Sequence, residues 1–139
     1  MNAFELYQLG RRLMKIGVRA MPDDEFGRLR GSTRAIVSDI FDNPGSSISE
    51  VTARVELPQS QVSACVAQLR ENDVVETFAD PADGRRTLVR PTEAALRRTR
   101  SRPPAEIDGA LAAAVGDDPA RLARARQALA TLAELLDGA

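Results

Sequence analysis

The chain has 139 residues, of which 43% are hydrophobic and 28% are charged, and its formal net charge is −1. A chain of this length is expected to form one soluble domain, residues 1–139, with its own hydrophobic core. It has no histidine and one cysteine, Cys65. These totals exclude an intrachain disulfide and argue against His-based catalysis, so we expect no enzyme activity, no metal site and no cofactor.

No apolar run approaches the ~20 residues that cross a membrane. Residues 1–20 carry too many charges for a signal peptide. We therefore expect a cytoplasmic protein without a membrane partner.

The first apolar residues have the spacing of an amphipathic helix over residues 2–20. They are Leu6, Leu9, Leu13 and Ile16. This stripe fits either the core of the chain or a dimer seam. Residues 21–31, with Pro22 and three consecutive acids, read as a connector.

A second helix is expected after the connector, with Ser32 or Thr33 as its cap. Its inward residues are Ile36, Val37, Ile40 and Phe41. Asn43-Pro44-Gly45 ends it, because Pro44 cannot continue a helix.

Ser47-Ile48-Ser49-Glu50 has the pattern of a capping box and opens a short helix. Leu57-Pro58 forms a turn into a further helix, which buries Val62, Val66 and Leu69. The outward face of that helix is small, polar and uncharged, and the helix has no acid or bulky residue on this face before Glu71. Such a face suits a helix that enters a groove better than an ordinary solvated surface.

Residues 74–78 and 87–91 are expected to be short strands, and the intervening ADPADGRR has the composition of a hairpin turn. Helix, turn, helix, strand, basic loop and strand follow one another in the order of a winged helix-turn-helix. We therefore predict a mainly α fold with a two-stranded β wing, whose DNA-binding part spans residues 32–91.

A helix over residues 94–102 is expected to break at Pro103-Pro104, since neither residue has an amide hydrogen. A last helix follows from Pro119 to Asp137, and its seam consists of Leu122, Leu129, Leu132 and Leu136. Residues 1–22 and 92–139 are predicted to pair two copies of the chain. Packing of the seam within its own chain is the alternative.

Charge is distributed unevenly along this pattern. Seven arginines and one acid, Glu93, lie between Arg85 and Arg102, whereas acids outnumber arginines after Pro103. DNA binding depends on such a local field more than on net charge. A solvated arginine-rich helix end is the alternative interpretation.

The segment from about residue 30 to residue 100 resembles the MarR family of bacterial transcription regulators. The resemblance rests on Ser47-Ile48-Ser49-Glu50, Ser60-Gln61-Val62-Ser63, Asp80-Pro81-Ala82-Asp83-Gly84-Arg85 and Thr92-Glu93. It implies an obligate homodimer that binds a pseudo-palindromic operator in bacterial DNA, and hence at the nucleoid. It also implies control by a small molecule or an oxidised cysteine. The resemblance further implies that Asp83 and Arg85 pair to hold the wing in shape.

Two positions depart from the family pattern. Ala64 stands where many members have an arginine that reaches base edges, and Gly84 replaces the first of the paired wing arginines, a role that Arg86 can take over.

The expected DNA contacts come from three places: the start of the second helix, the outward face of the helix that buries Val62, Val66 and Leu69, and the wing. The residues are Thr33, Arg34, Gln59, Ser60, Gln61, Ser63, Gln68, Arg85 and Arg86.

The predicted function is a dimeric, sequence-specific DNA-binding transcription regulator, most simply a repressor. The alternative is a winged helix module that binds another protein and has lost base readout, which Ala64, Gly84 and the acidic pI favour. Cys65 likewise has two interpretations, a small core residue or a redox sensor.

Overall fold

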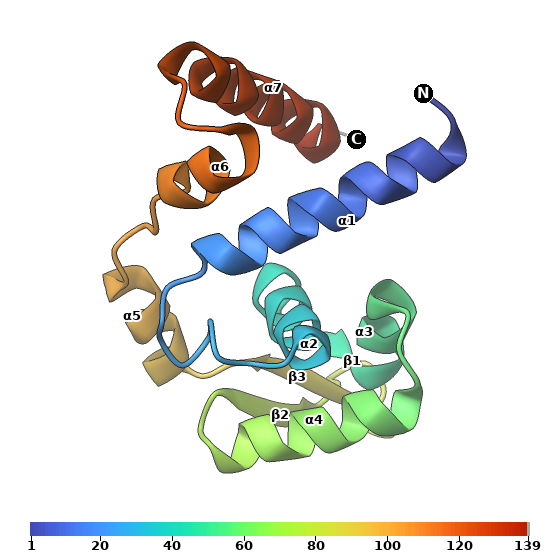
Figure 1. Cartoon of the computed structure of the whole chain (residues 1–139). Coiled ribbons are helices and arrows are strands. Elements are labelled where there is room, and N and C mark those ends of the chain that lie inside the picture. The colour runs from blue at the N-terminus through green and yellow to red at the C-terminus, as the bar shows by residue number, and fades with distance from the viewer. Residues whose placement is uncertain (139) are drawn as a thin grey trace. The chain divides into compact units, whose positions relative to one another are not determined.

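The computed structural model describes residues 1–138, which form two compact units. The central unit is the continuous segment Arg28–Pro103. The terminal unit combines Met1–Gly27 with the chain from Pro104 onward. Each unit is built around its own helices (Figure 1). The predicted division into a DNA-binding part and terminal dimerisation helices stays a prediction.

The central unit contains four helices and a small antiparallel sheet among its described residues. Its elements are α2 (Gly31–Asp42), β1 (Ser46–Ser47), α3 (Ile48–Val55), α4 (Gln59–Glu71), β2 (Val75–Ala79), β3 (Thr87–Pro91) and α5 (Glu93–Ser101). The strand order is β1-β3-β2, so β3 is the central strand. The mainly α fold with a β wing is confirmed.

The core of the central unit comes from the apolar stripes that the sequence indicated. Its buried side chains from helices are Ile36, Val37, Ile40, Val51, Val62, Val66, Leu69 and Ala95. Val75 and Val89 close it from the sheet. Helix α3 contacts both α2 and α4, and α4 also contacts β2. This packing holds α4 by one face and leaves the opposite face exposed.

Two local expectations about this unit were wrong or incomplete. Helix α2 begins at Gly31, and its N-cap is Arg30, without any side-chain cap from Ser32 or Thr33. The sheet also has a third strand, because Ser46 and Ser47 pair with Val89 and Leu88. A two-residue strand has too little pattern to be recognised in a sequence.

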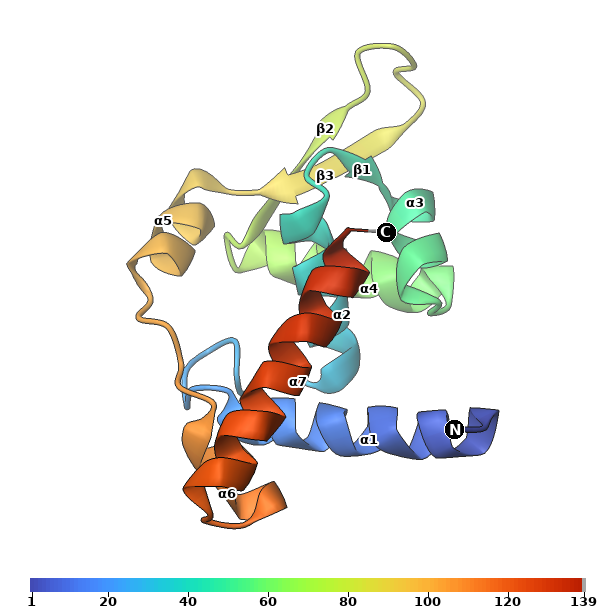
Figure 2. The same cartoon turned by 90° about the horizontal axis from the view of Figure 1, so that it is seen from above.

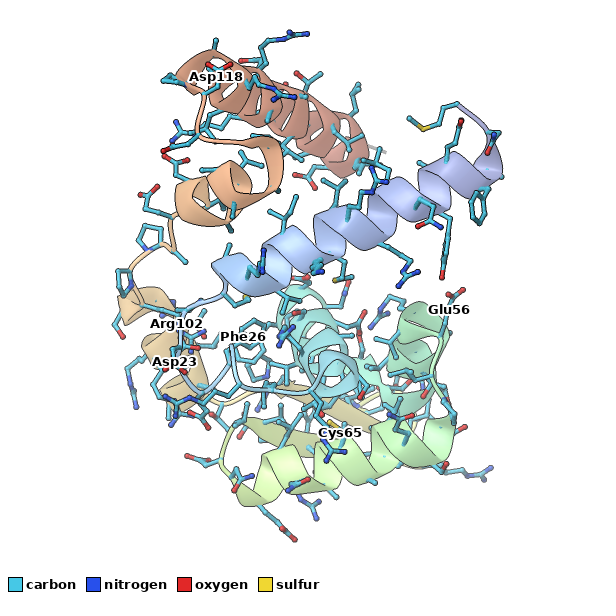
Figure 3. All side chains as sticks on the ribbon, in the orientation of Figure 1. Asp23, Phe26, Glu56, Cys65, Arg102 and Asp118 are labelled. Carbon is cyan, nitrogen blue, oxygen red and sulfur yellow. The ribbon has the colours of Figure 1, made fainter. Side chains whose placement is uncertain are left out.

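The terminal unit consists of α1 (Ala3–Ala20), α6 (Asp108–Val115) and α7 (Pro119–Asp137). Helix α6 contacts both α1 and α7 and contributes the buried Leu111. Asp118 caps α7 by accepting a hydrogen bond from the Ala120 amide, and Arg126 of α7 pairs with Asp108 of α6 (Figure 3). The helix break at Pro103-Pro104 is confirmed, since α5 ends at Ser101 and α6 begins at Asp108.

Many large apolar side chains of the terminal unit remain exposed. They include Phe4, Leu6, Tyr7 and Met14 of α1 and Leu132, Leu135 and Leu136 of α7. Neither α1 nor α7 has a fully buried side chain in the described chain. None of the described helices is long and apolar enough to cross a membrane.

Candidate nucleic-acid interface

Helices α3 and α4 form a tightly joined pair. Ser47 and Glu50 make the predicted capping box, in which the Ser47 hydroxyl accepts from the Glu50 amide at 3.2 Å and Glu50 Oε2 accepts from the Ser47 amide at 3.0 Å. Helix α3 ends at Val55, and its C-cap, Glu56, adopts the left-handed conformation at φ 54° (Figure 3). A non-glycine residue in this region indicates a turn that the surrounding packing enforces. This turn fixes the direction in which α4 leaves.

The outer face of α4 has the character that the sequence indicated. Every position predicted on it is exposed and none is charged: Gln59, Ser60, Gln61, Ser63, Ala64, Ala67 and Gln68. Amide and hydroxyl side chains both donate and accept hydrogen bonds. Such a surface can therefore pair with base edges in a major groove, provided that attraction to DNA comes from elsewhere.

The wing is the hairpin formed by β2, β3 and the loop Asp80–Arg86. Its strands pair from Val75–Pro91 to Ala79–Thr87. The Asp80 amide donates to the Arg86 carbonyl at 2.9 Å, and the Arg86 amide donates to the Asp83 carbonyl at 2.9 Å. Figure 2 shows the loop extending beyond the paired parts of the strands. The wing is therefore a defined turn that projects from the sheet.

The two wing arginines have different surroundings. Arg85 is exposed, and in the described part of the chain its guanidinium has no ion pair. Arg86 Nη2 lies 2.7 Å from Glu50 Oε1, and its Nη1 lies 3.6 Å from Asp80 Oδ2. The Arg85 side chain therefore extends freely from the wing, whereas that of Arg86 is engaged within the unit.

Asp83 bonds within the wing loop, but not with the Arg85 side chain as the resemblance implied. Its carboxylate accepts a hydrogen bond from the backbone amide of Arg85 at 3.1 Å, and the guanidinium of Arg85 takes no part. Asp80 makes the equivalent bond with the Ala82 amide at 2.9 Å. Two carboxylates thus fix consecutive turns of the loop through its backbone.

Glu50 is the residue that sequence reasoning missed as part of this interface. One oxygen caps α3 and the other binds Arg86. The Ser47 amide, followed by Arg86, lowers the pKa of the Glu50 carboxyl below its usual value, so this group is ionised at neutral pH. The capping box signal identified Glu50 as a helix cap, but its wing partner lies 36 residues away in the sequence.

A second ion pair supports α3 from its other end. Arg54 donates to both oxygens of Asp39 in α2, at 2.8 and 2.9 Å, and to the Ser46 hydroxyl. The hydrogen bond with Asp39 raises the pKa of Arg54. Helix α3 is thus tied to α2 at one place and to the wing at another.

Thr33 and Arg34 have partners inside the central unit. Arg34 Nη2 donates to the Leu29 carbonyl at 2.8 Å, and the Thr33 side chain lies within hydrogen-bonding reach of the Cys65 thiol. Both residues are half-buried. Their contact with a DNA phosphate stays a prediction, and the geometry gives it no particular support.

The predicted dimerisation leucines fall into two groups within the terminal unit. Leu9, Leu13, Leu129 and Leu132 line an open groove of about 550 Å³ between α1, α6 and α7. Leu6, Leu122 and Leu136 lie outside that groove, and of these Leu6 and Leu136 are exposed. Part of the leucine seam therefore faces its own chain, and the rest is available to a partner.

The family comparison identifies the central unit. Residues 29–95 match the family model described as a winged helix DNA-binding domain. The central unit therefore has a winged helix fold. This match is to a DNA-binding family and not to an enzyme family. No curated protein sequence matches the chain.

Solved structures extend the likeness beyond the winged helix domain. A MepR mutant from multidrug resistant S. aureus has 13% identity and a TM-score of 0.66, with 99% of this chain and 98% of that chain covered. BpsR of Bordetella bronchiseptica has 20% identity and a TM-score of 0.56, with 96% and 92% covered. FabT of Streptococcus pneumoniae, solved in complex with DNA, has 14% identity and a TM-score of 0.52, with 97% and 92% covered. The similarity to MarR-family regulators is thus confirmed in the fold.

Cys65 lies on the inner side of α4 in the winged helix domain (Figure 3), half-buried and within hydrogen-bonding reach of the Thr33 side chain. Burial raises the pKa of its thiol above the usual value, and the bond with Thr33 opposes this only in part. A raised pKa keeps the protonated, unreactive form at neutral pH. The geometry thus favours a packing role over a redox sensor.

We expect Cys65 in the folded protein to react with iodoacetamide much more slowly at pH 7 than the same thiol in urea-unfolded protein. The rate should rise only as the pH approaches the raised pKa. Mass spectrometry of timed samples measures this. Equal rates for folded and unfolded protein at pH 7 would show that the thiol is accessible and ionised, as a sensor requires.

Proposed function

We propose that this protein is a homodimeric, sequence-specific DNA-binding transcription regulator that represses by occupying a pseudo-palindromic operator. The observation that carries the proposal is the pairing of an uncharged, hydrogen-bonding α4 face with a projecting wing that presents Arg85. A regulator with this role would act at the nucleoid, in the bacterial cytoplasm.

The two elements have complementary tasks in the proposal. Gln61 has the amide that can bind adenine N6 and N7 together, and Ser60 and Ser63 suit bases or phosphates. Neutral contacts specify a sequence but attract DNA weakly. A guanidinium such as that of Arg85 gains from the concentrated negative potential of a narrow minor groove.

DNA from immediately upstream of the protein's own gene is the first duplex to test. If a dimer neutralises about six phosphates, the logarithm of the binding constant should fall with that of the salt concentration with a slope of roughly −5. Gln61→Ala should cost about 1–3 kcal/mol on the operator and nothing on a scrambled duplex. Gel shift and fluorescence anisotropy on both duplexes measure these effects.

Failure of this experiment has a specific meaning. No binding at low salt, or a slope near zero, would favour the alternative winged helix module that binds protein. Equal weakening of both duplexes by Gln61→Ala would remove α4 from the reading role.

The exposed apolar side chains of the terminal unit support the proposed homodimer. Monomeric proteins rarely expose a large contiguous apolar surface. Leu135 and Leu136 are 70% and 67% exposed on α7, and Phe4 and Tyr7 are exposed on α1. A second copy of the chain would cover such surfaces symmetrically.

We expect the 15.0 kDa chain to have the mass of a dimer in light scattering at micromolar concentration. Changing Leu135 and Leu136 together to glutamate should dissociate it without unfolding, because both side chains are exposed in a single chain. Ala123→Glu, on the opposite face of α7, is the matched control and should remain dimeric. A wild-type monomer, or a double variant that stays dimeric, would contradict this interface.

The groove in the terminal unit supports a small-molecule effector. Its walls are largely apolar, its volume is in the range of ligand sites, and Arg12, Lys15 and Arg19 are among the residues that line it. No acidic side chain lines it among the described residues. DNA binding by the similar BpsR is regulated by 6-hydroxynicotinic acid. We propose that an amphipathic organic anion binds here.

Benzoate is a suitable probe, and benzylamine, with the opposite charge, is its control. Benzoate should raise the melting temperature in a concentration-dependent way, whereas benzylamine should not. Lys15→Glu should abolish the shift, and Arg11→Glu, which lies outside the groove, should retain it. Equal effects of the two compounds, or an unchanged shift in Lys15→Glu, would refute an anion site in this groove.

A further inference from the structure

The contacts of Glu50 join two elements that a winged helix domain uses together. Glu50 Oε2 accepts from the Ser47 amide at the start of α3, and Glu50 Oε1 accepts from the Arg86 guanidinium at 2.7 Å. One carboxylate therefore links the helix-turn-helix to the wing loop. The two linked residues lie 36 positions apart in the sequence.

The guanidinium of Arg86 also reaches back to its own loop. Its Nη1 lies 3.6 Å from Asp80 Oδ2, and the Arg86 carbonyl accepts from the Asp80 amide. Only an arginine has the planar fork needed to address two carboxylates in different directions. Two acids around one cation also leave little net positive charge to attract DNA.

We infer that Arg86 is a positioning residue that sets the wing against α3 through Glu50, and that Arg85 alone supplies the wing's contact with DNA. This inference rests on the proposed function. It divides two adjacent arginines, which the sequence presented as equivalent, into one that fixes the wing and one that binds.

Substitution of Glu50 distinguishes positioning from direct contact by the sign of its effect. Glu50→Gln keeps a side chain that can cap α3, since glutamine also serves in a capping box, but it removes the ion pair with Arg86. If Arg86 binds DNA directly, removal of the nearby negative charge frees it and tightens binding. If Arg86 positions the wing, the same change weakens binding despite the lost repulsion.

We expect Glu50→Gln and Arg86→Ala each to weaken operator binding about two- to tenfold, because exposed ion pairs are modest and a dimer contains two. The double variant should bind the operator with the same affinity as the single variant that binds less tightly, since both changes break the same interaction. Neither change should alter the salt slope. Arg85→Ala is the matched control and should flatten the slope by about 1.8 per dimer, the loss of one phosphate contact in each protomer.

Amide hydrogen exchange in the DNA-free protein gives a readout that is independent of DNA binding. The amides of Asp80 and Arg86 close the wing loop by their hydrogen bonds. They should exchange faster in Glu50→Gln and in Arg86→Ala than in the wild type, and at the wild-type rate in Arg85→Ala. Arg86→Lys keeps the positive charge but lacks the planar guanidinium, so the wing-loop amides of this variant should also exchange faster than in the wild type.

The outcomes separate this inference from the proposed function. Absence of DNA binding by the wild type refutes the proposed function, while the exchange rates still test the positioning. Unchanged or tighter binding in Glu50→Gln, or a flattened slope in Arg86→Ala, shows that Arg86 contacts DNA and overturns the inference. Unchanged exchange in both variants overturns it as well.

Discussion

The pairing of β1 with β3 is the interaction on which the arrangement of the winged helix domain depends. Ser46 and Ser47 pair with Val89 and Leu88, and the Gly45 amide donates to the Val89 carbonyl at 2.8 Å. Ser47 is also the N-cap of α3. The strand that returns from the wing therefore begins beside the N-cap of α3, since Ser47 pairs with Leu88 near the start of β3. This short ladder connects the α3–α4 pair to the wing through backbone hydrogen bonds, and the side-chain bonds described above add to this connection.

The electrostatics of the domain follow from where its charges are neutralised. Three arginines form ion pairs within the domain. Arg54 pairs with Asp39, Arg86 pairs with Glu50 and Asp80, and Arg90 pairs with Glu76. Arg90 additionally lies over the Phe78 ring, at 4.4 Å from its centroid. Arg86 and Arg90 belong to the basic stretch between Arg85 and Arg102, so these two arginines are engaged within the fold itself. A count of arginines along the sequence overstates the charge that DNA would meet, and Arg85 is the one that the wing leaves exposed and without an ion pair in the described chain.

The sequence was informative where a signal is local and less so where a contact is distant. The capping box at Ser47 and Glu50, the break at Pro103-Pro104 and the last helix, Pro119–Asp137, all match the structure. Each rests on residues that are neighbours in the chain. Strand β1 was missed because its partner lies about 40 residues away and its two serines have no strand pattern. The roles of Arg85 and Arg86 could not be separated for the same reason, since Glu50 lies on a different element.

The order of the two units along the chain has a consequence for synthesis on the ribosome. The central unit is one continuous segment inserted into the terminal unit. It can therefore fold as soon as Pro103 has emerged, whereas α1 has to wait for α6 and α7. At roughly 5–20 residues per second, synthesis from the end of α1 at Ala20 to the end of α7 at Asp137 takes roughly 6–23 s. During this time the apolar side chains of α1 have no partner from their own unit, so nascent chains on neighbouring ribosomes, or a chaperone, would meet them first.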